Sequence, residues 1–358
     1  MKIFVHVTAS AIDKMQNNKI FTGEKNYHEM LYALLSWGSA SLMGIEKEKL
    51  GNEYFVSISN SKYLQNMWTE EQSIELKHNT DWQTDILKKQ IEIFDPDILY
   101  TVNPSWIGKN IDKLPDIRVF AAWRAAPIRS KEDYSCFDVG LSYAPIYMDL
   151  MKKHGISNVE HMDFSFDPEV KKRLDQMDLE KQNDICFVGR YGKMFNHRNK
   201  LLYDVYRKFK DNNSIAYHLL TEKRFCGLIP QLPWRMLNAV NEPVFLNELL
   251  EVFARSKIVI NCHSDIAGQH KGNMRVFEAL GTGSFMLSDK GIYPEFLKDG
   301  EDFISYENTD DLLDKIEYYL KNEDEREEIA KHGYETICKY YSTEAGSKKL
   351  RSIFEDYL

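Results

Sequence analysis

The chain has 358 residues, of which 43% are hydrophobic and 13% aromatic, a composition that supports packed cores and argues against intrinsic disorder. Its length exceeds what one hydrophobic core usually supports, so we expect two domains of about 150 residues each. The 55 acidic and 46 basic residues give a formal net charge of -9, which disfavours nonspecific binding to nucleic acid and to anionic lipid.

Targeting segments and cysteine motifs are not evident. The longest apolar runs fall far below the roughly 18 residues that cross a bilayer, and the opening MKIFVHVTAS lacks a signal-peptide pattern. We therefore expect a cytoplasmic protein. The five cysteines are widely spaced and form no CxxC pair, so neither a disulfide framework nor a zinc site is indicated.

In the first half, short β-like runs alternate with helix-like stretches, as in a parallel sheet covered by helices. A helix is predicted over 24–38, where apolar residues recur at helical spacing. The candidate strands of this half are 2–8, 54–59, 97–102, 118–123 and 138–144.

The polar segment 167–184 interrupts this pattern and is interpreted as a linker between an N-terminal domain, 1–166, and a C-terminal domain, 185–342. The last stretch, 343–358, is a predicted helix that could pack back on the N-terminal domain. The second half has candidate strands at 185–189, 215–220, 258–262 and 284–289 and candidate helices at 197–209, 246–256, 273–280 and 309–320. Two Rossmann-like domains with a cleft between them are the economical α/β architecture.

The segment KGNMRVFEALGTG, residues 271–283, follows the predicted strand 258–262 after a polar loop. Asn273 is a good N-cap and Gly281 a good helix stop, so we expect a short helix whose amino end can bind an anion. Arg275 and Glu278 share one face of it, where Arg275 could reach a phosphate and Glu278 two vicinal hydroxyls. The alternative is a simple Arg–Glu surface pair.

Three stretches of the second half resemble a known family: NMRVFEALGTGSFMLSD, PEFLKDGEDFISYENTDDLLDKIEYYL and DEREEIAKHGYETI. They are similar to the carboxy-terminal half of family-4-type glycosyltransferases, especially the CgeB-like, spore-maturation-related branch, over about 250–345. The resemblance implies the GT-B fold, with two facing Rossmann-like domains, an interdomain cleft and a nucleotide held mainly by the second domain.

The resemblance also implies site residues. Glu278 matches the family glutamate that binds the donor ribose, and the amino end of the helix, Asn273, Met274 and Arg275, matches the diphosphate loop. Lys271, at the start of the segment, is a further donor-binding candidate. Family members commonly carry a second glutamate eight positions earlier, which is His270 here. His270 either contacts the transferred sugar instead or is an ordinary loop residue.

The opening of the second domain, ICFVGRYGKMFNHR, is similar to the family's F-x-G start, in which nearby basic residues face the diphosphate. Arg190, Lys193 and Arg198 are the candidates, and at most two of them should reach the site. The resemblance to GT-B enzymes implies a reaction without a metal, in which such cations neutralise the leaving diphosphate, so we expect neither a metal nor another cofactor. Val244, in the stretch NEPVFLNELL, is a weak candidate for packing beside the nucleobase.

On the acceptor side, the stretch FTGEKNYHEM resembles the glycine loop and first helix of a GT-B amino-terminal domain. Gly23 would allow close approach of the donor, and Glu24 could act as general base if the enzyme inverts. The alternative for Glu24 is a carboxylate that complements the helix dipole. His161, before the linker, is a further candidate at the edge of the cleft.

The sequence thus predicts transfer of a sugar from a nucleotide-diphosphate sugar to a hydroxyl of a glycan or cell-surface precursor, as in polysaccharide biosynthesis. The family type suggests retention of configuration. A lipid-linked acceptor would bring the protein to a membrane surface, and no nucleic acid partner is expected. The alternatives are a sugar-nucleotide epimerase of the same layout and a noncatalytic nucleotide-sugar or glycan-binding relative, which the histidine at 270 keeps open.

Overall fold

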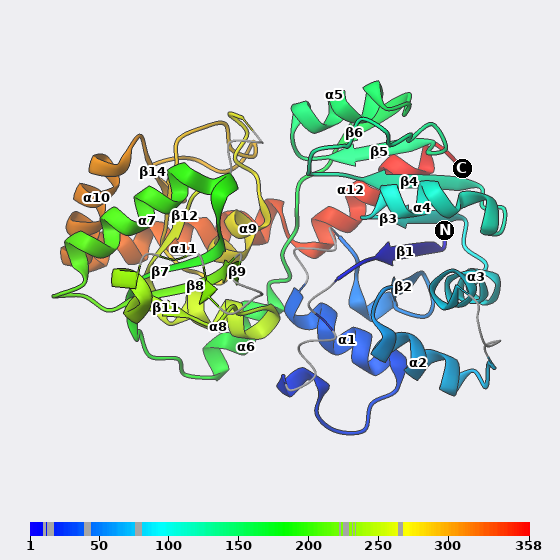
Figure 1. Cartoon of the computed structure of the whole chain (residues 1–358), viewed down its shortest axis with the longest axis horizontal. Coiled ribbons are helices and arrows are strands. Elements are labelled where there is room, and N and C mark those ends of the chain that lie inside the picture. The colour runs from blue at the N-terminus through cyan, green and yellow to red at the C-terminus, as the bar shows by residue number, and fades with distance from the viewer. Residues whose placement is uncertain are drawn as a thin grey trace. The chain divides into compact units, whose positions relative to one another are not determined.

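The computed structural model describes residues 1–9, 12, 18–38, 44–75, 81–221, 223–224, 229–230, 232, 234–263 and 268–358. The chain folds into two compact units, the first made of Met1–Asp163 with Gly346–Leu358 and the second of Phe164–Ala345 (Figure 1). The segment 167–184, interpreted above as a linker, lies in the second unit. It contains helix α6 (Glu169–Gln176), which buries Val170 and Leu174.

The first unit is built on a six-stranded parallel sheet in the order β2-β1-β3-β4-β5-β6. Each strand predicted in the first half is present, and β6, which is short and polar, is the addition. The strands are β1 (Ile3–Val7), β2 (Tyr54–Ile58), β3 (Ile98–Thr101), β4 (Val119–Trp123), β5 (Val139–Ser142) and β6 (Asn158–His161). The α-helices that flank them are α1 (Tyr27–Gly38), α2 (Lys62–Glu71), α3 (Trp82–Phe94), α4 (Pro104–Asn110) and α5 (Pro145–Lys153).

The C-terminal helix α12 (Thr343–Glu355) brings the end of the chain back to the first unit (Figure 1). The ring of Phe354 packs on Tyr100 at 5.7 Å between centroids, and the Tyr54 hydroxyl lies 3.1 Å from the Ser347 hydroxyl. The backbone of Gly44 lies so close to α12 that an added Cβ would be 2.4 Å from a main-chain carbon of Gly346. Helix α12 is therefore an integral part of this unit.

The second unit has a six-stranded parallel sheet in the order β11-β8-β7-β12-β13-β14. Its strands are β7 (Asn183–Tyr191), β8 (Ile215–Thr221), β11 (Val240–Asn241), β12 (Ser256–Asn261), β13 (Met286–Asp289) and β14 (Ile304–Tyr306), beside a two-stranded ribbon of β9 (Lys223–Arg224) and β10 (Ile229–Pro230). Its remaining helices are α7 (Asn196–Phe209), α8 (Leu246–Ala254), α9 (Met274–Gly281), α10 (Thr309–Lys321) and α11 (Glu323–Tyr340).

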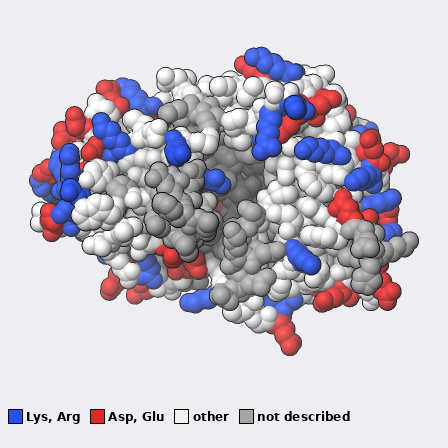
Figure 2. Space-filling view, in the orientation of Figure 1, with Lys and Arg blue, Asp and Glu red and all other residues white. Residues whose placement is uncertain are grey.

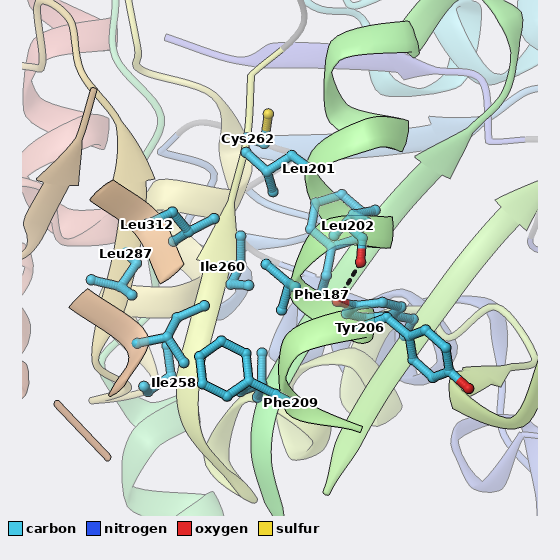
Figure 3. Close-up of a cluster of buried hydrophobic side chains, with 14 of the residues drawn as sticks. Phe187, Leu201, Leu202, Tyr206, Phe209, Ile258, Ile260, Cys262, Leu287 and Leu312 are labelled. Atoms are coloured by element: carbon cyan, nitrogen blue, oxygen red, sulfur yellow. Dashed lines mark hydrogen bonds between the residues drawn. The ribbon is translucent and has the colours of Figure 1, made fainter. Parts of the chain in front are cut away.

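A cluster of apolar side chains on this sheet packs against α7 and α10 (Figure 3). Strand residues such as Phe187, Ile258, Ile260 and Leu287 are at most 3% exposed. The near-continuous burial along the central strands is what a parallel sheet with both faces covered requires. This core fixes the strand ends on which the functional residues lie.

Both sheets reverse their strand order once. In the second unit the chain runs outward from β7 to β8 and β11 and then returns to place β12 on the other side of β7. In open parallel sheets, ligands bind beyond the carboxyl ends of the strands at such a switch point. The ends of β7 and β12 therefore mark the expected ligand position in the second unit.

Candidate functional site

Helix α9 begins at the carboxyl edge of this sheet, beyond the end of β12. As predicted, Asn273 is its N-cap, and the Asn273 side-chain oxygen accepts from the backbone N–H of Val276 at 3.4 Å. The amide of Asn261, the last residue of β12, donates to the Asn273 oxygen at 3.4 Å and to the Ser288 hydroxyl of β13 at 3.1 Å. The amino end of α9 is thus anchored to two strands, with its dipole oriented to favour an anion.

Arg198 bridges the switch point itself. Its guanidinium donates to the carbonyl of Cys262, just after β12, at 2.5 Å and to that of Arg190, near the end of β7, at 3.3 Å. The residue is 9% exposed, its Nε has no hydrogen-bond partner, and among the described residues no carboxylate lies within ion-pair distance of it. A buried cation without a carboxylate is costly, and an anionic ligand would compensate it.

Arg275 and Glu278 lie on one face of α9, as predicted, and their side chains form an ion pair. The Nε of Arg275 also donates to the carbonyl of Val188 in β7 at 3.3 Å. The Arg275 guanidinium therefore links α9 to β7 and orients the Glu278 carboxylate. Its partners are thus protein groups, whereas the sequence predicted a contact with a phosphate.

Lys271 is 8% exposed and extends to β13, where its ammonium lies 2.6 Å from Oδ2 of Asp289. The other carboxylate oxygen of Asp289 lies 2.7 Å from Nδ1 of His263 and accepts the His263 backbone N–H at 2.9 Å. Burial alone raises the pKa of Asp289, but the hydrogen bonds from His263 and Lys271 hold it well below its ordinary value. The carboxylate is therefore ionised.

His263 and Asp289 are not among the residues selected from the sequence. His263 lies two residues after the end of β12, and Asp289 is the last residue of β13. The carboxyl ends of these adjacent parallel strands lie at the same edge of the sheet. A polar residue at each of two strand ends is the signal that could have identified the pair.

Solved structures with the same architecture are numerous and distant in sequence. HepE of Anabaena, in complex with UDP-glucose, matches with a TM-score of 0.59 at 11% identity, covering 99% of this chain and 100% of HepE. AviGT4, a glycosyltransferase of avilamycin A biosynthesis, gives 0.58 at 13% identity over 100% of this chain and 98% of its own. A glycosyltransferase of Rickettsia africae gives 0.57 at 11% identity over 99% and 98%. This chain has the GT-B fold.

Residues 204–351 of this GT-B chain also match a protein-family model described as "Glycosyl transferase-like". The matched region contains α9, β12 and β13, and therefore Lys271, Glu278, His263 and Asp289. No curated protein sequence matches the chain. The similarity to this glycosyltransferase family thus covers most of the second GT-B unit, including α9 and the ends of β12 and β13, but it begins after β7 and Arg198.

The other residues predicted to bind the donor also lie in the second unit, but their side chains are more exposed than those of Arg198 and Lys271. Arg190 near the end of β7 and Lys193 in a short 3-10 helix are exposed, whereas Val244 and His270 are half-buried. His270 pairs with Ile292 in an isolated β-bridge. Part of the loop before it, residues 264–267, lies outside the described residues.

The predicted acceptor-side residues lie in the first unit. Gly23 has a φ of +83°, and both it and Glu24 are exposed in the segment before α1. His161 ends β6, where it is exposed and lies 3.0 Å from a carboxylate oxygen of Asp163. Because β6 lies four strands from β1, their ends are about 19 Å apart by strand spacing alone, so His161 is remote from the end of β1.

Two further observations concern the described residues alone. They contain no group of three or more His, Cys, Asp and Glu side chains that could hold a metal ion. None of their helices is both long and apolar enough to span a membrane.

Proposed function

We propose that this protein transfers a sugar from a nucleoside-diphosphate sugar to a hydroxyl acceptor. The observation that carries the proposal is the buried Arg198 cation, which bridges the switch point beside the capped amino end of α9. A diphosphate placed there would supply the negative charge that Arg198 lacks. The structural similarity to glycosyltransferases over nearly the full chain supports the same conclusion.

The chemistry follows from the charges at this edge. When the bond between the sugar and the diphosphate breaks, negative charge grows on the leaving diphosphate. Arg198 and the free N–H groups of α9 can stabilise that charge, with the exposed Arg190 and Lys193 as further cations. These groups do what a metal ion would otherwise do, so we propose a reaction without metal or other cofactor.

Donor recognition is proposed to depend on Glu278, whose carboxylate would accept hydrogen bonds from the two ribose hydroxyls while Arg275 holds it in place. UDP-glucose is the first donor to test, because HepE was crystallised with it. Met274 and Asn273 at the start of α9 and Val244 beside the nucleobase are secondary contacts in this proposal. His270 would contact the transferred sugar.

We further propose a retaining hexosyltransferase related to the CgeB-like branch, on the strength of the RVFEA motif at 275–279. A retaining reaction of this type needs no enzymic base, so Glu24 and His161 would bind the acceptor, and Gly23 would allow close approach of the donor. The acceptor would be a glycan or a lipid-linked precursor, reached by a cytoplasmic protein at the membrane surface.

Nucleic acid is not a proposed acceptor. One GT-B neighbour, an α-glucosyltransferase, was crystallised with UDP and a 13-mer DNA. The present chain carries a formal charge of -9, and on the face shown in Figure 2 Lys and Arg are interspersed with Asp and Glu rather than gathered into a patch. Such a surface offers little general attraction to a polyanion.

One assay separates this function from its alternatives. The protein is incubated with isotopically labelled nucleotide sugars, with and without glycan acceptors, and the free nucleoside diphosphate and the labelled sugar are followed. Release of nucleoside diphosphate with label in the acceptor supports transfer. Conversion of the sugar while it stays attached to the nucleotide would establish an epimerase instead, and binding without turnover a noncatalytic relative.

Replacement of Glu278 tests the ribose contact. Glu278→Gln should weaken binding of UDP by about 10- to 100-fold, because it removes a charged hydrogen-bond acceptor, and should reduce the preference for UDP over 2′-deoxy-UDP. Calorimetry with the two nucleotides measures both effects. The matched control is Glu301→Gln, at an exposed carboxylate of the same unit, and unchanged UDP binding by Glu278→Gln would refute the assignment.

A further inference from the structure

His263 carries a ring nitrogen that nothing in the described chain satisfies. The His263 side chain is 2% exposed, and its Nδ1 lies 2.7 Å from Oδ1 of Asp289. Its Nε2 is buried and has no hydrogen-bond partner among the residues that the structure describes. Buried polar atoms in folded proteins are nearly always paired, so an unpaired one at the carboxyl edge of a sheet calls for a partner from outside the chain.

The surroundings decide what kind of partner this is. The Asp289 carboxylate is ionised and can only accept hydrogen bonds, so Nδ1 of His263 carries the hydrogen that lies between the two side chains. In the imidazole tautomer with its hydrogen on Nδ1, Nε2 presents a lone pair. The Lys271 ammonium lies 2.6 Å from Oδ2 of Asp289, so the buried Asp289 carboxylate already has a countercharge and needs no second cation. A lone pair accepts from a hydroxyl, whereas the oxygens of an ionised diphosphate are themselves acceptors.

The positions of His263, Asp289 and Lys271 in the sheet indicate which hydroxyl group of a nucleotide sugar His263 binds. Arg275 attaches Glu278 to β7, whereas His263 and Lys271 are attached to Asp289 of β13, and β12 lies between these two strands. Two strand spacings amount to about 10 Å, a separation that the ribose, the diphosphate and the sugar of a nucleotide sugar span together rather than the diphosphate alone. If the ribose lies at Glu278, the group at the other end of the diphosphate lies at His263.

We propose that Nε2 of His263 accepts a hydrogen bond from a hydroxyl group of the transferred sugar, which makes His263 a specificity residue for the donor. Asp289 is a positioning residue, since its two contacts to His263 fix the ring, and Lys271 holds Asp289. The ring is covered in the structure, so the contact forms on a rearrangement that accompanies donor binding. This inference rests on the proposed function and deepens it.

The test compares two probes, UDP and UDP-glucose, by calorimetry on the full chain. His263→Asn retains a donor for Asp289 but lacks an atom at Nε2. It should bind UDP-glucose about 5- to 10-fold more weakly and bind UDP within about twofold of wild type, because only the sugar contact is lost. The control is His332→Asn, at an exposed histidine of α11.

Two further measurements keep the inference falsifiable should His263→Asn fold poorly. His263→Gln places an amide oxygen near the position of Nε2 and should retain UDP-glucose affinity within about threefold. The second measurement uses UDP-deoxyglucose analogues that each lack one sugar hydroxyl. One analogue should bind the wild-type protein about 5- to 10-fold more weakly than UDP-glucose does, whereas His263→Asn should bind that analogue and UDP-glucose equally well.

The outcomes separate the two proposals. Equal weakening of UDP and UDP-glucose by His263→Asn would overturn the sugar contact, and so would unchanged UDP-glucose binding. In either case wild-type binding of nucleotide sugars would leave the proposed function standing. If the wild-type protein binds neither UDP-glucose nor any other nucleotide sugar of the panel, the proposed function fails and this inference fails with it.

Discussion

At the scale of single residues, the decisive feature is the buried cation of Arg198, which donates hydrogen bonds to two main-chain carbonyls and, among the described residues, has no carboxylate partner. The guanidinium of Arg198 lies 4.6 Å from the ring centroid of Phe195 and 5.6 Å from that of Phe187, so aromatic faces contribute to holding it. The spacing after the FVG motif identifies Arg198 as a candidate. Its burial and its contact with Cys262, 64 positions away, depend on the fold.

Arg198→Met tests whether this charge serves a ligand. The variant keeps an apolar stem beside the two rings, so thermal stability should be retained or rise, whereas UDP affinity should fall by about 10- to 100-fold. Thermal unfolding and calorimetry measure the two quantities on one sample. The exposed Arg207 on the same helix provides the control Arg207→Met. Loss of stability with intact UDP binding would show that Arg198 is only structural.

At the scale of elements, α9 is the best predicted part of the site. Local signals suffice for it, since an N-cap and a short apolar face act within a few residues. The expected role of Gly281 as the helix stop is wrong. Gly283 takes the left-handed conformation, with φ of +71°, whereas an added Cβ on Gly281 would lie 2.3 Å from the ring of Phe166. Gly281 is required by close packing.

Gly281→Ala is expected to lower the free energy of unfolding by about 1–3 kcal/mol, because the overpacking against Phe166 outweighs the better helix propensity of alanine. Urea unfolding measures the change. Phe166→Leu added to Gly281→Ala should recover part of the loss, since the smaller side chain leaves room for the methyl group. A stabilised Gly281→Ala variant would contradict the close contact.

At the scale of the whole molecule, the chain crosses from one unit to the other and returns. Besides its contacts to Tyr54 and Tyr100, helix α12 carries Arg351, whose guanidinium lies 2.6 Å from a carboxylate oxygen of Glu53, and the buried residues Leu350 and Phe354. The amphipathic pattern at 343–358 predicts the helix but not its partner, because either unit could cover one apolar face.

Removal of residues 343–358 should therefore destabilise the first unit selectively. Its core would lose Leu350 and Phe354, each worth about 2–5 kcal/mol by analogy with large-to-small core substitutions. Limited proteolysis with mass spectrometry should show faster cleavage within 1–163 than within 164–342. Removal of 356–358 alone is the control, and equal cleavage rates in the full and shortened chains would refute this role of α12.

The sequence by itself determined the type of most elements, the α/β class, the capped helix α9 and the placement of Arg275 and Glu278 on one face of that helix. These depend on periodicity, caps and spacing within a few residues. The edge strands β6 and β14 are not predicted from the sequence. β6 has four residues, most of them polar, and β14 has three, so neither is long enough to show an alternation of apolar and polar residues.

Only the tertiary structure decided the strand order, the switch point, the unit to which α12 belongs, and the buried cluster of His263, Asp289 and Lys271. Asp289 meets His263 across 26 positions and Ser347 meets Glu46 across 301. Such contacts form only when strands pair in one order and bring their carboxyl ends to one edge, and this order is selected by burial summed over the whole core rather than by any local pattern.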